Sequence, residues 1–362
     1  MPQRTLQLIT STDDDRPVYV AGTFNDWTVA DPAYRMEATD RLGHYHRTFE
    51  LPEGERIEYK YTRGGWEGVE LDEHCGNAQN HSRTVETGRR WSPPDRVHCW
   101  ASPGLHYRHD LLPKIEIIHE NFEIPQLIRT RRVAALLPHN YYEQPDKRYP
   151  VLYLQDGQNL FDDAAPYGSW GVDKRMAALT ERGMGDLIIV SIDHGDTERV
   201  SEFTPSFDTR LGRGDGGKYV RFLAETLKPY IDDHYRTQPG PTTTGIGGSS
   251  LGGLVSIYAG LLYPNVYDRL MIFSPSLWVA PRIPVHLTKL SRKFAGRVYL
   301  YGGEAESKTM VSHLRSFRQE ILDVATAGRV EFRIEIDPLG KHTEARWGAE
   351  FPRAVEWLFF SP

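Results

Sequence analysis

The chain has 362 residues, 39% of them hydrophobic and 25% charged, which is typical of a folded globular protein and excludes a disordered one. At roughly 150 residues per domain, the length favours two domains. The formal net charge of −6, with no run of lysine or arginine, excludes nucleic acid and membrane surfaces as expected partners. Residues 1–6 lack a signal-peptide pattern and no apolar run reaches the length of a membrane span, so we expect a cytoplasmic protein.

The cysteine and histidine patterns predict neither a disulfide framework nor a metal site. The two cysteines, Cys75 and Cys99, are too few for a disulfide scaffold, and we expect free thiols that are at least partly buried. No HExxH motif is present, and the histidines His106 and His109 lie in a segment that we expect to be a linker. We therefore predict no metal and no other cofactor.

The first part of the chain has the pattern of a small all-β domain. Short runs of alternating side chains, such as residues 44–49 and 58–62, are separated by turn residues at about ten-residue spacing. This spacing predicts an antiparallel, immunoglobulin-like β-sandwich over residues 1–87. Residues 88–113 are rich in proline and glycine and predict a linker to a second domain over residues 114–362.

Strands and helices alternate in the second domain. The expected strands are residues 115–119, 132–137, 151–154, 187–193, 242–247, 270–274, 298–301 and 331–336. The expected helices are residues 172–182, 217–234, 251–263, 310–327 and 344–360. Continuous apolar strands indicate burial on both faces, so we predict an α/β fold with a mostly parallel central sheet covered by helices.

A G-x-S-x-G motif at Gly248, Ser250 and Gly252 follows one of these strands and precedes a helix. This context is typical of a strained strand-to-helix turn that exposes a nucleophilic serine, and the glycines let neighbouring backbone pass closely. The helix N-terminus also favours the negative charge that develops during attack. We therefore predict that Ser250 is a nucleophile.

A serine hydroxyl needs a base, and the base needs an orienting acid. His342 lies in a glycine-containing loop between the last strand and the C-terminal helix, where α/β-hydrolases carry their base. The acid is expected after the strand at residues 298–301, where Glu304 and Glu306 both provide a carboxylate. The hypothesis requires the imidazole of His342 to reach the hydroxyl of Ser250.

Residues 110–360 resemble the Putative esterase family, which includes enterochelin, feruloyl and acetylxylan esterases. The similarity lies in residues 148–161, 202–205, 227–232 and 248–253. The resemblance implies an α/β-hydrolase fold and a cofactor-free serine esterase. The family's G-x-x-[DE] motif falls on residues 303–306, which favours Glu306 over Glu304 as the acid.

The resemblance also implies two oxyanion donors, the backbone N–H groups of Leu251 and Gln158. Such donors bind the negative oxygen of a tetrahedral intermediate. The chain departs from the family where Gln155, Asp156 and Gly157 replace a common His-Gly pair. This departure concerns the shape of the oxyanion loop.

The N-terminal region is similar to starch- and glycogen-binding β-sandwich modules, at residues 21–27, 51–54 and 58–66. This resemblance implies that Trp27 or Trp66 stacks on a sugar ring, because an aromatic face offers a large contact area at little entropy cost. Two other roles are packing within the sandwich core and, as in enterochelin esterases, shaping the esterase cleft.

The expected substrate is a small-molecule ester. Ferric-siderophore trilactones are anionic, and Arg199, Arg210 and Arg213 are candidates to balance that charge. Siderophore breakdown follows uptake and therefore suits a cytoplasmic enzyme. The alternatives are a feruloyl or acetyl esterase acting on carbohydrate esters, an acyltransferase, and a carbohydrate-binding protein without catalysis.

Overall fold

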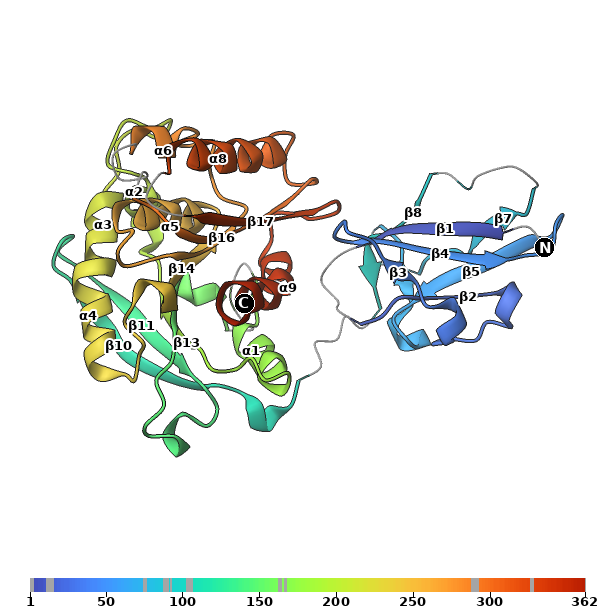
Figure 1. The fold of residues 1–362 in the computed structure, drawn as a ribbon, viewed down its shortest axis with the longest axis horizontal. Coiled ribbons are helices and arrows are strands. Elements are labelled where there is room, and N and C mark those ends of the chain that lie inside the picture. Colours follow the sequence, from blue (N-terminus) through green and yellow to red (C-terminus); the bar gives the residue numbers. More distant parts are fainter. Residues whose placement is uncertain are drawn as a thin grey trace. The chain divides into compact units, whose positions relative to one another are not determined.

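The computed structural model describes residues 3–10, 16–73, 77–86, 91, 93–101, 107–161, 165, 168–287, 293–325 and 329–361. The chain forms two compact units. In Figure 1 the ribbon is coloured along the sequence, from blue at the N-terminus to red at the C-terminus. Unit 1 comprises Met1–Leu105, Gly303–Ala305 and Ile336–Lys341. Unit 2 comprises His106–Gly302, Glu306–Glu335 and His342–Pro362.

Unit 1 consists of short strands in three sheets. The first sheet has the order β3-β4-β1-β8, with strands Glu37–Ala38, His44–Glu50, Gln3–Thr10 and Asp95–Val97. The second has the order β2-β5-β7, with strands Tyr19–Gly22, Arg56–Thr62 and His81–Thr84. The third pairs β6 (Glu70–Leu71) with β9 (Cys99–Trp100).

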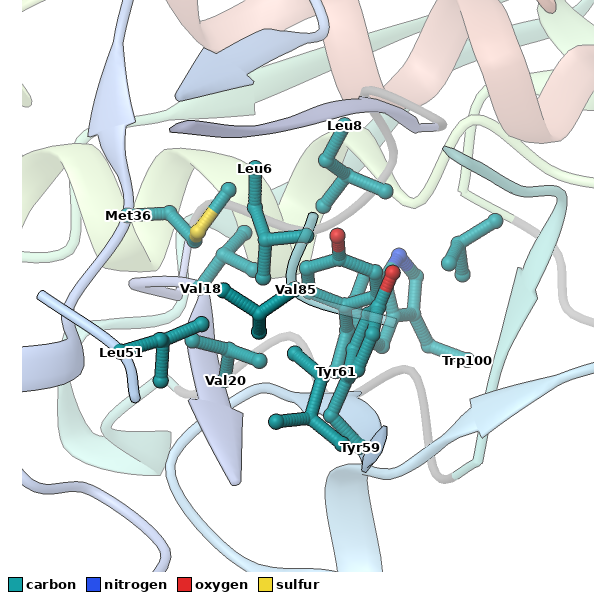
Figure 2. Close-up of a cluster of buried hydrophobic side chains, with 12 residues drawn as sticks. Leu6, Leu8, Val18, Val20, Met36, Leu51, Tyr59, Tyr61, Val85 and Trp100 are labelled. Atoms are coloured by element: carbon teal, nitrogen blue, oxygen red, sulfur yellow. The ribbon is translucent and has the colours of Figure 1, made fainter. Parts of the chain in front are cut away.

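The core of unit 1 draws on both larger sheets. Side chains of a strand alternate between its two faces, so Ile57, Tyr59 and Tyr61 of β5 all point to one side, and each is at most 1% exposed. They form one apolar cluster with Leu6 and Leu8 of β1, as Figure 2 shows. This shared core explains why the alternating N-terminal pattern produces a sandwich.

The sequence-based prediction of a linker over residues 88–113 is wrong for part of that segment. Strand β8 pairs in parallel with β1, joining Leu8 to Asp95 in register, and β9 pairs with β6. The prediction failed because these strands have three and two residues, too few for a visible period.

A buried polar network attaches β8 to the second sheet. The hydroxyl groups of Tyr59 and Tyr61 both donate to Asp95 Oδ2, at 2.8 Å each. Arg83 donates to the other oxygen of the same carboxylate. Burial and the charge of Asp95 raise the pKa of both phenols, so these tyrosines remain hydrogen donors.

The expectation of a free thiol is wrong at Cys99, which is disulfide-bonded. Cysteine pairing follows spatial proximity in the folded chain, and a sequence with two widely spaced cysteines does not reveal it. Cys75 and His106 lie outside the described residues.

An eight-stranded sheet forms the centre of unit 2, in the order β10-β11-β13-β12-β14-β15-β16-β17. Strands β13, β12, β14, β15 and β16 run parallel, whereas β10 and β11 are antiparallel to their neighbours. The strands are Lys114–Ile124, Arg129–Leu137, Ile188–Ile192, Val151–Gln155, Thr244–Ser249, Arg269–Phe273, Gly296–Gly303 and Val330–Asp337, in that order across the sheet. All eight predicted strands and the mostly parallel sheet are confirmed.

Helices cover both faces of this sheet (Figure 1). The described helices are α1 (Val172–Glu181), α2 (Arg199–Phe203), α3 (Gly216–Phe222), α4 (Lys228–His234), α5 (Leu251–Leu262), α6 (Ile283–His286), α8 (Met310–Val324) and α9 (Glu344–Val355). Helix α1 contacts α9, and α5 contacts α2 and α3. Every residue of β12 and β13 is buried, as their continuous apolar sequences predict.

None of the helices in the described part of the chain is both long and apolar enough to cross a bilayer.

The Asp95 network gives a test of the extended sandwich. We expect Asp95→Ala to lower the free energy of unfolding of the full chain by about 3 kcal/mol, because two buried hydroxyls lose their acceptor. Urea unfolding followed by tryptophan fluorescence measures the change. Asp95→Asn keeps one acceptor oxygen and should lower the free energy of unfolding less than Asp95→Ala does. An unchanged unfolding midpoint for Asp95→Ala would contradict the structural role of β8.

Candidate active site

Ser250 occupies the turn between β14 and α5. Its backbone has φ 56° and ψ −122°, a strained conformation for a residue with a Cβ. Its amide donates to Phe273 O at 3.0 Å, and its carbonyl accepts from Ser276 N at 2.9 Å. The hydroxyl lies 3.3 Å from Ser276 Oγ. Neighbouring backbone therefore holds the turn in the geometry of a nucleophile elbow.

The glycines of the motif are required by close contacts. A Cβ at Gly248 would lie 3.1 Å from Gln155 Cβ and 3.0 Å from the carbonyl carbon of Gly252. A Cβ at Gly252 would lie 2.8 Å from Asp156 Oδ2. The elbow thus packs directly against the end of β12 and the loop after it, and a Cβ at Gly252 would require the carboxylate of Asp156 to move.

A histidine and a carboxylate pair in the loops that follow β16 and β17. His342 Nδ1 lies 2.7 Å from Glu306 Oε2. The Glu306 side chain is 2% exposed, whereas that of His342 is 43% exposed. Because Nδ1 faces the carboxylate as a donor, Nε2 is left as the basic nitrogen of a neutral ring.

The alternative acid lies elsewhere in its loop. Glu304 is exposed, and its backbone N–H donates to Asp337 O at 2.9 Å. Of the two carboxylates left open by the sequence, Glu306 is the one that pairs with His342.

Ser250 and His342 line one cavity of about 820 Å³. Its walls come from the loops after β12 and β13, from the elbow and from the start of α9. They are Asp156, Asn159, His194, Asp196, Thr197, Arg199, Ser249, Ser250, His342, Thr343, Glu344 and Trp347. The serine and the imidazole thus line the same space, and the reach of His342 to the hydroxyl of Ser250 stays a prediction.

Arg199 lines the cavity with its charge already paired. Its Nε and Nη2 donate to the two oxygens of Asp156, at 2.6 and 2.8 Å. Burial by itself lowers the pKa of Arg199. The hydrogen bonds and the negative charge of Asp156 have the larger effect together, so the pKa of Arg199 is raised. Asp196 and Glu344 add two further carboxylates to the walls. Burial raises the pKa of Glu344.

Gln158 lies between the cavity residues Asp156 and Asn159. Its side-chain amide exchanges two hydrogen bonds with the backbone of His194, at 3.1 and 3.0 Å. This exchange fixes the loop after β12 to the loop after β13. Gln158 and Leu251 both lie in the first turn of a helix, where N–H groups have no partner within the helix.

Two other predicted binding residues of unit 2, Arg210 and Arg213, are not among the residues that line this cavity. Arg210 lines a separate hollow with Phe207 and Val279, and the exposed Arg213 pairs with Asp208. In unit 1, the rings of Trp27 and Trp66 lie 6.2 Å apart, and Trp66 is 44% exposed. Neither tryptophan belongs to the buried cluster of unit 1.

Sequence reasoning missed several residues around the pair. Ser274, Trp347, His194 and Glu344 were not singled out, although His194 and Ser274 follow the buried strands β13 and β15. Polar residues directly after parallel strands gather at one edge of a sheet, and this signal was available. Within the described residues, no group of three or more His, Cys, Asp or Glu is placed to hold a metal.

The strand order of unit 2 and its elbow serine define the α/β-hydrolase class. The chain belongs to the family described as Putative esterase, whose model matches residues 124–358. It is therefore an ester hydrolase.

The relatives cover different parts of the chain. The protein named YbbA from Bacillus subtilis (strain 168) is 25% identical over 242 residues, 63% of this chain and 92% of YbbA. An alpha-amylase from Niallia circulans is 40% identical over 78 residues, 22% of this chain and 6% of the amylase. The solved enterobactin esterase FES from Shigella flexneri, in the presence of enterobactin, has a TM-score of 0.54 at 16% identity, covering 99% of this chain and 92% of that structure.

Asp193, directly after β13, gives a pH-dependent prediction. Its side chain is 15% exposed, and its nearest cation, Arg132 Nη1, is 3.7 Å from Oδ1. Burial raises the pKa of Asp193 from 3.8 to about 6. The folded state therefore binds a proton on the Asp193 carboxyl more tightly than the unfolded state does. The protonated carboxyl stabilises the folded state below about pH 4, and this stabilisation is lost as the pH rises through 6.

We expect Asp193→Asn to be more stable than the wild type at pH 7.5, by about 2 kcal/mol, and equal to it near pH 4. Urea unfolding at the two pH values measures the difference. Asp196→Asn is the matched control, because that side chain is 88% exposed and should change neither value. A loss of stability for Asp193→Asn at pH 7.5 would refute the assignment.

Proposed function

We propose that the chain hydrolyses carboxylic esters through Ser250, His342 and Glu306. His342 Nε2 takes the proton of Ser250 as its Oγ bonds to the ester carbonyl carbon. The imidazolium then gives that proton to the departing alkoxide, which leaves an acyl-enzyme. Water, activated by the same imidazole, releases the acid and restores the serine.

The observation that carries this proposal is the 2.7 Å pair of His342 Nδ1 and Glu306 Oε2, beside the cavity that Ser250 also lines. The buried carboxylate holds the imidazole in the tautomer that accepts at Nε2 and stabilises the cation that forms. The backbone N–H groups of Leu251 and Gln158 are the proposed oxyanion donors. Their support is the two helix N-termini on which they lie and the fixed side chain of Gln158.

A siderophore ester is the first proposed substrate. Its support is the similarity in fold, over 99% of this chain, to an enterobactin esterase. The proposed role of arginines in binding an anionic ester has less support. Arg199 is already paired with Asp156, and Arg213 is paired with Asp208.

A carbohydrate ester is the second proposed substrate. Its support is the pair of Trp27 and Trp66, of which Trp66 is 44% exposed, in a region whose sequence is similar to starch-binding modules. Such a pair suits stacking on a sugar ring. Feruloyl and acetyl esters of sugars are uncharged at the sugar, which suits a cavity where the guanidinium of Arg199 is already paired with Asp156.

A cytoplasmic location also stays a proposal. It suits the breakdown of a siderophore after uptake. The disulfide at Cys99 counts against it, because disulfides are rare in reducing compartments. Fractionation of the producing cells, with the chain detected in each fraction, would decide this point.

The nucleophile is tested with p-nitrophenyl acetate. We expect Ser250→Ala to lower kcat by about 10⁴- to 10⁶-fold, as removal of a triad member does in serine hydrolases. Ser249→Ala changes the neighbouring residue and should lower kcat far less. A fluorophosphonate probe should label the wild type at Ser250, as peptide mass spectrometry would show. Comparable activity of Ser250→Ala and the wild type would end the proposal and favour binding without catalysis.

The substrate is tested by kcat/KM for a ferric catecholate trilactone and a feruloylated sugar. We expect kcat/KM for the preferred ester to exceed kcat/KM for the other by at least about tenfold. The reason is that a single contact in a binding pocket changes the discrimination between two substrates by about 1–3 kcal/mol. If the tryptophan pair binds sugar, Trp66→Ala raises KM for the feruloylated sugar but not for p-nitrophenyl acetate. Similar, low rates for both esters would defeat both substrate proposals, and ester products formed in added alcohol would indicate acyl transfer.

A further inference from the structure

Ser274 lies at the end of β15, next to the pair of Glu306 and His342. Its side chain is buried and its φ is 42°, a left-handed conformation that is unusual for a residue other than glycine. Its amide donates to Tyr301 O at 2.7 Å, which holds this conformation. Such strain persists only where surrounding structure enforces it, and it is concentrated at functional sites.

The hydroxyl of Ser274 joins two groups. Its Oγ lies 2.7 Å from Glu306 Oε1 and 2.8 Å from Trp347 Nε1. An indole nitrogen can only donate, so the hydroxyl must accept from Trp347. Its single proton is then directed to Glu306. The indole thereby sets the direction of the hydroxyl's hydrogen bond.

This direction has a consequence for the carboxylate. Glu306 accepts from Ser274 at Oε1 and from His342 at Oε2. The serine hydroxyl therefore holds one oxygen of the carboxylate and the imidazole holds the other. These two bonds prevent the carboxylate from rotating.

Trp347 contacts the imidazole as well. Its ring meets that of His342 edge to face, with centroids 4.8 Å apart and an interplanar angle of 86°. It also lines the cavity. One side chain thus packs against the base and, through Ser274, directs the acid that orients the base.

We propose that Ser274 and Trp347 are positioning residues that fix Glu306, and through it His342, for proton transfer from Ser250. The inference rests on the proposed function of these three residues. Neither Ser274 nor Trp347 touches the reacting atoms in this role. Their effect is to keep His342 Nε2 aimed at the serine in every turnover.

The test uses the full chain and p-nitrophenyl acetate. We expect Ser274→Ala to lower kcat by about 10- to 100-fold, as loss of a supporting hydrogen bond does at other sites, with KM changed less than about twofold. Trp347→Phe keeps a packed ring but removes the N–H, so its loss should be smaller. Ser274→Cys retains a weak donor and should restore part of the kcat lost in Ser274→Ala.

A spectroscopic readout does not depend on turnover. The proton between His342 Nδ1 and Glu306 should give a downfield ¹H NMR signal in the wild type and in Ser250→Ala. In Ser274→Ala this signal should broaden or disappear, because the carboxylate is no longer held. A merely structural role for Ser274 would leave it unchanged in a variant with a native circular dichroism spectrum.

The outcomes separate the two proposals. If Ser250→Ala remains active, the proposed function fails. If Ser250→Ala is inactive while Ser274→Ala keeps wild-type kcat and the downfield signal, only the positioning role is overturned. Should Ser274→Ala not fold, Trp347→Phe decides: unchanged kcat and an unchanged signal overturn the role, and a reduced kcat with unchanged KM supports it.

Discussion

The parallel, in-register pairing of β14, β15 and β16 is the constraint on which the site depends. Ser249 pairs with Phe273, and Phe273 pairs with Tyr301, so β14 and β15 end at the same level, while β16 continues to Gly303. The residues that follow them, Ser250, Ser274 and the loop with Glu306, therefore emerge at one edge of the sheet. Residues far apart in the chain become neighbours because their strands are neighbours.

Close backbone approach completes the arrangement. The elbow contacts the loop after β12 so closely that a Cβ at Gly252 would lie 2.8 Å from Asp156 Oδ2. Asp156 has φ 58° and binds Arg199 through both oxygens. This bridge holds the loop after β12 and occupies the charge of Arg199, which lines the cavity.

Unit 1 is stabilised in a different way. Its sheets are small, and a polar network of Asp95, Tyr59, Tyr61 and Arg83 lies within its apolar core. Buried polar groups of this kind are stable only when each has its partner. Trp27 and Trp66 lie outside that core, with their rings 6.2 Å apart.

The sequence by itself determined the α/β class, the eight strands of unit 2 and the elbow, because these follow from local periodicity and from glycines at fixed spacing. It also singled out Ser250 from its motif and His342 from its loop, and a family resemblance favoured Glu306 over Glu304. Only the tertiary structure decided that Glu306 rather than Glu304 faces His342, that Arg199 is paired, and that Ser274 and Trp347 support the acid. These facts depend on where side chains from separate strands and helices meet, and neither periodicity nor spacing along the chain encodes such contacts.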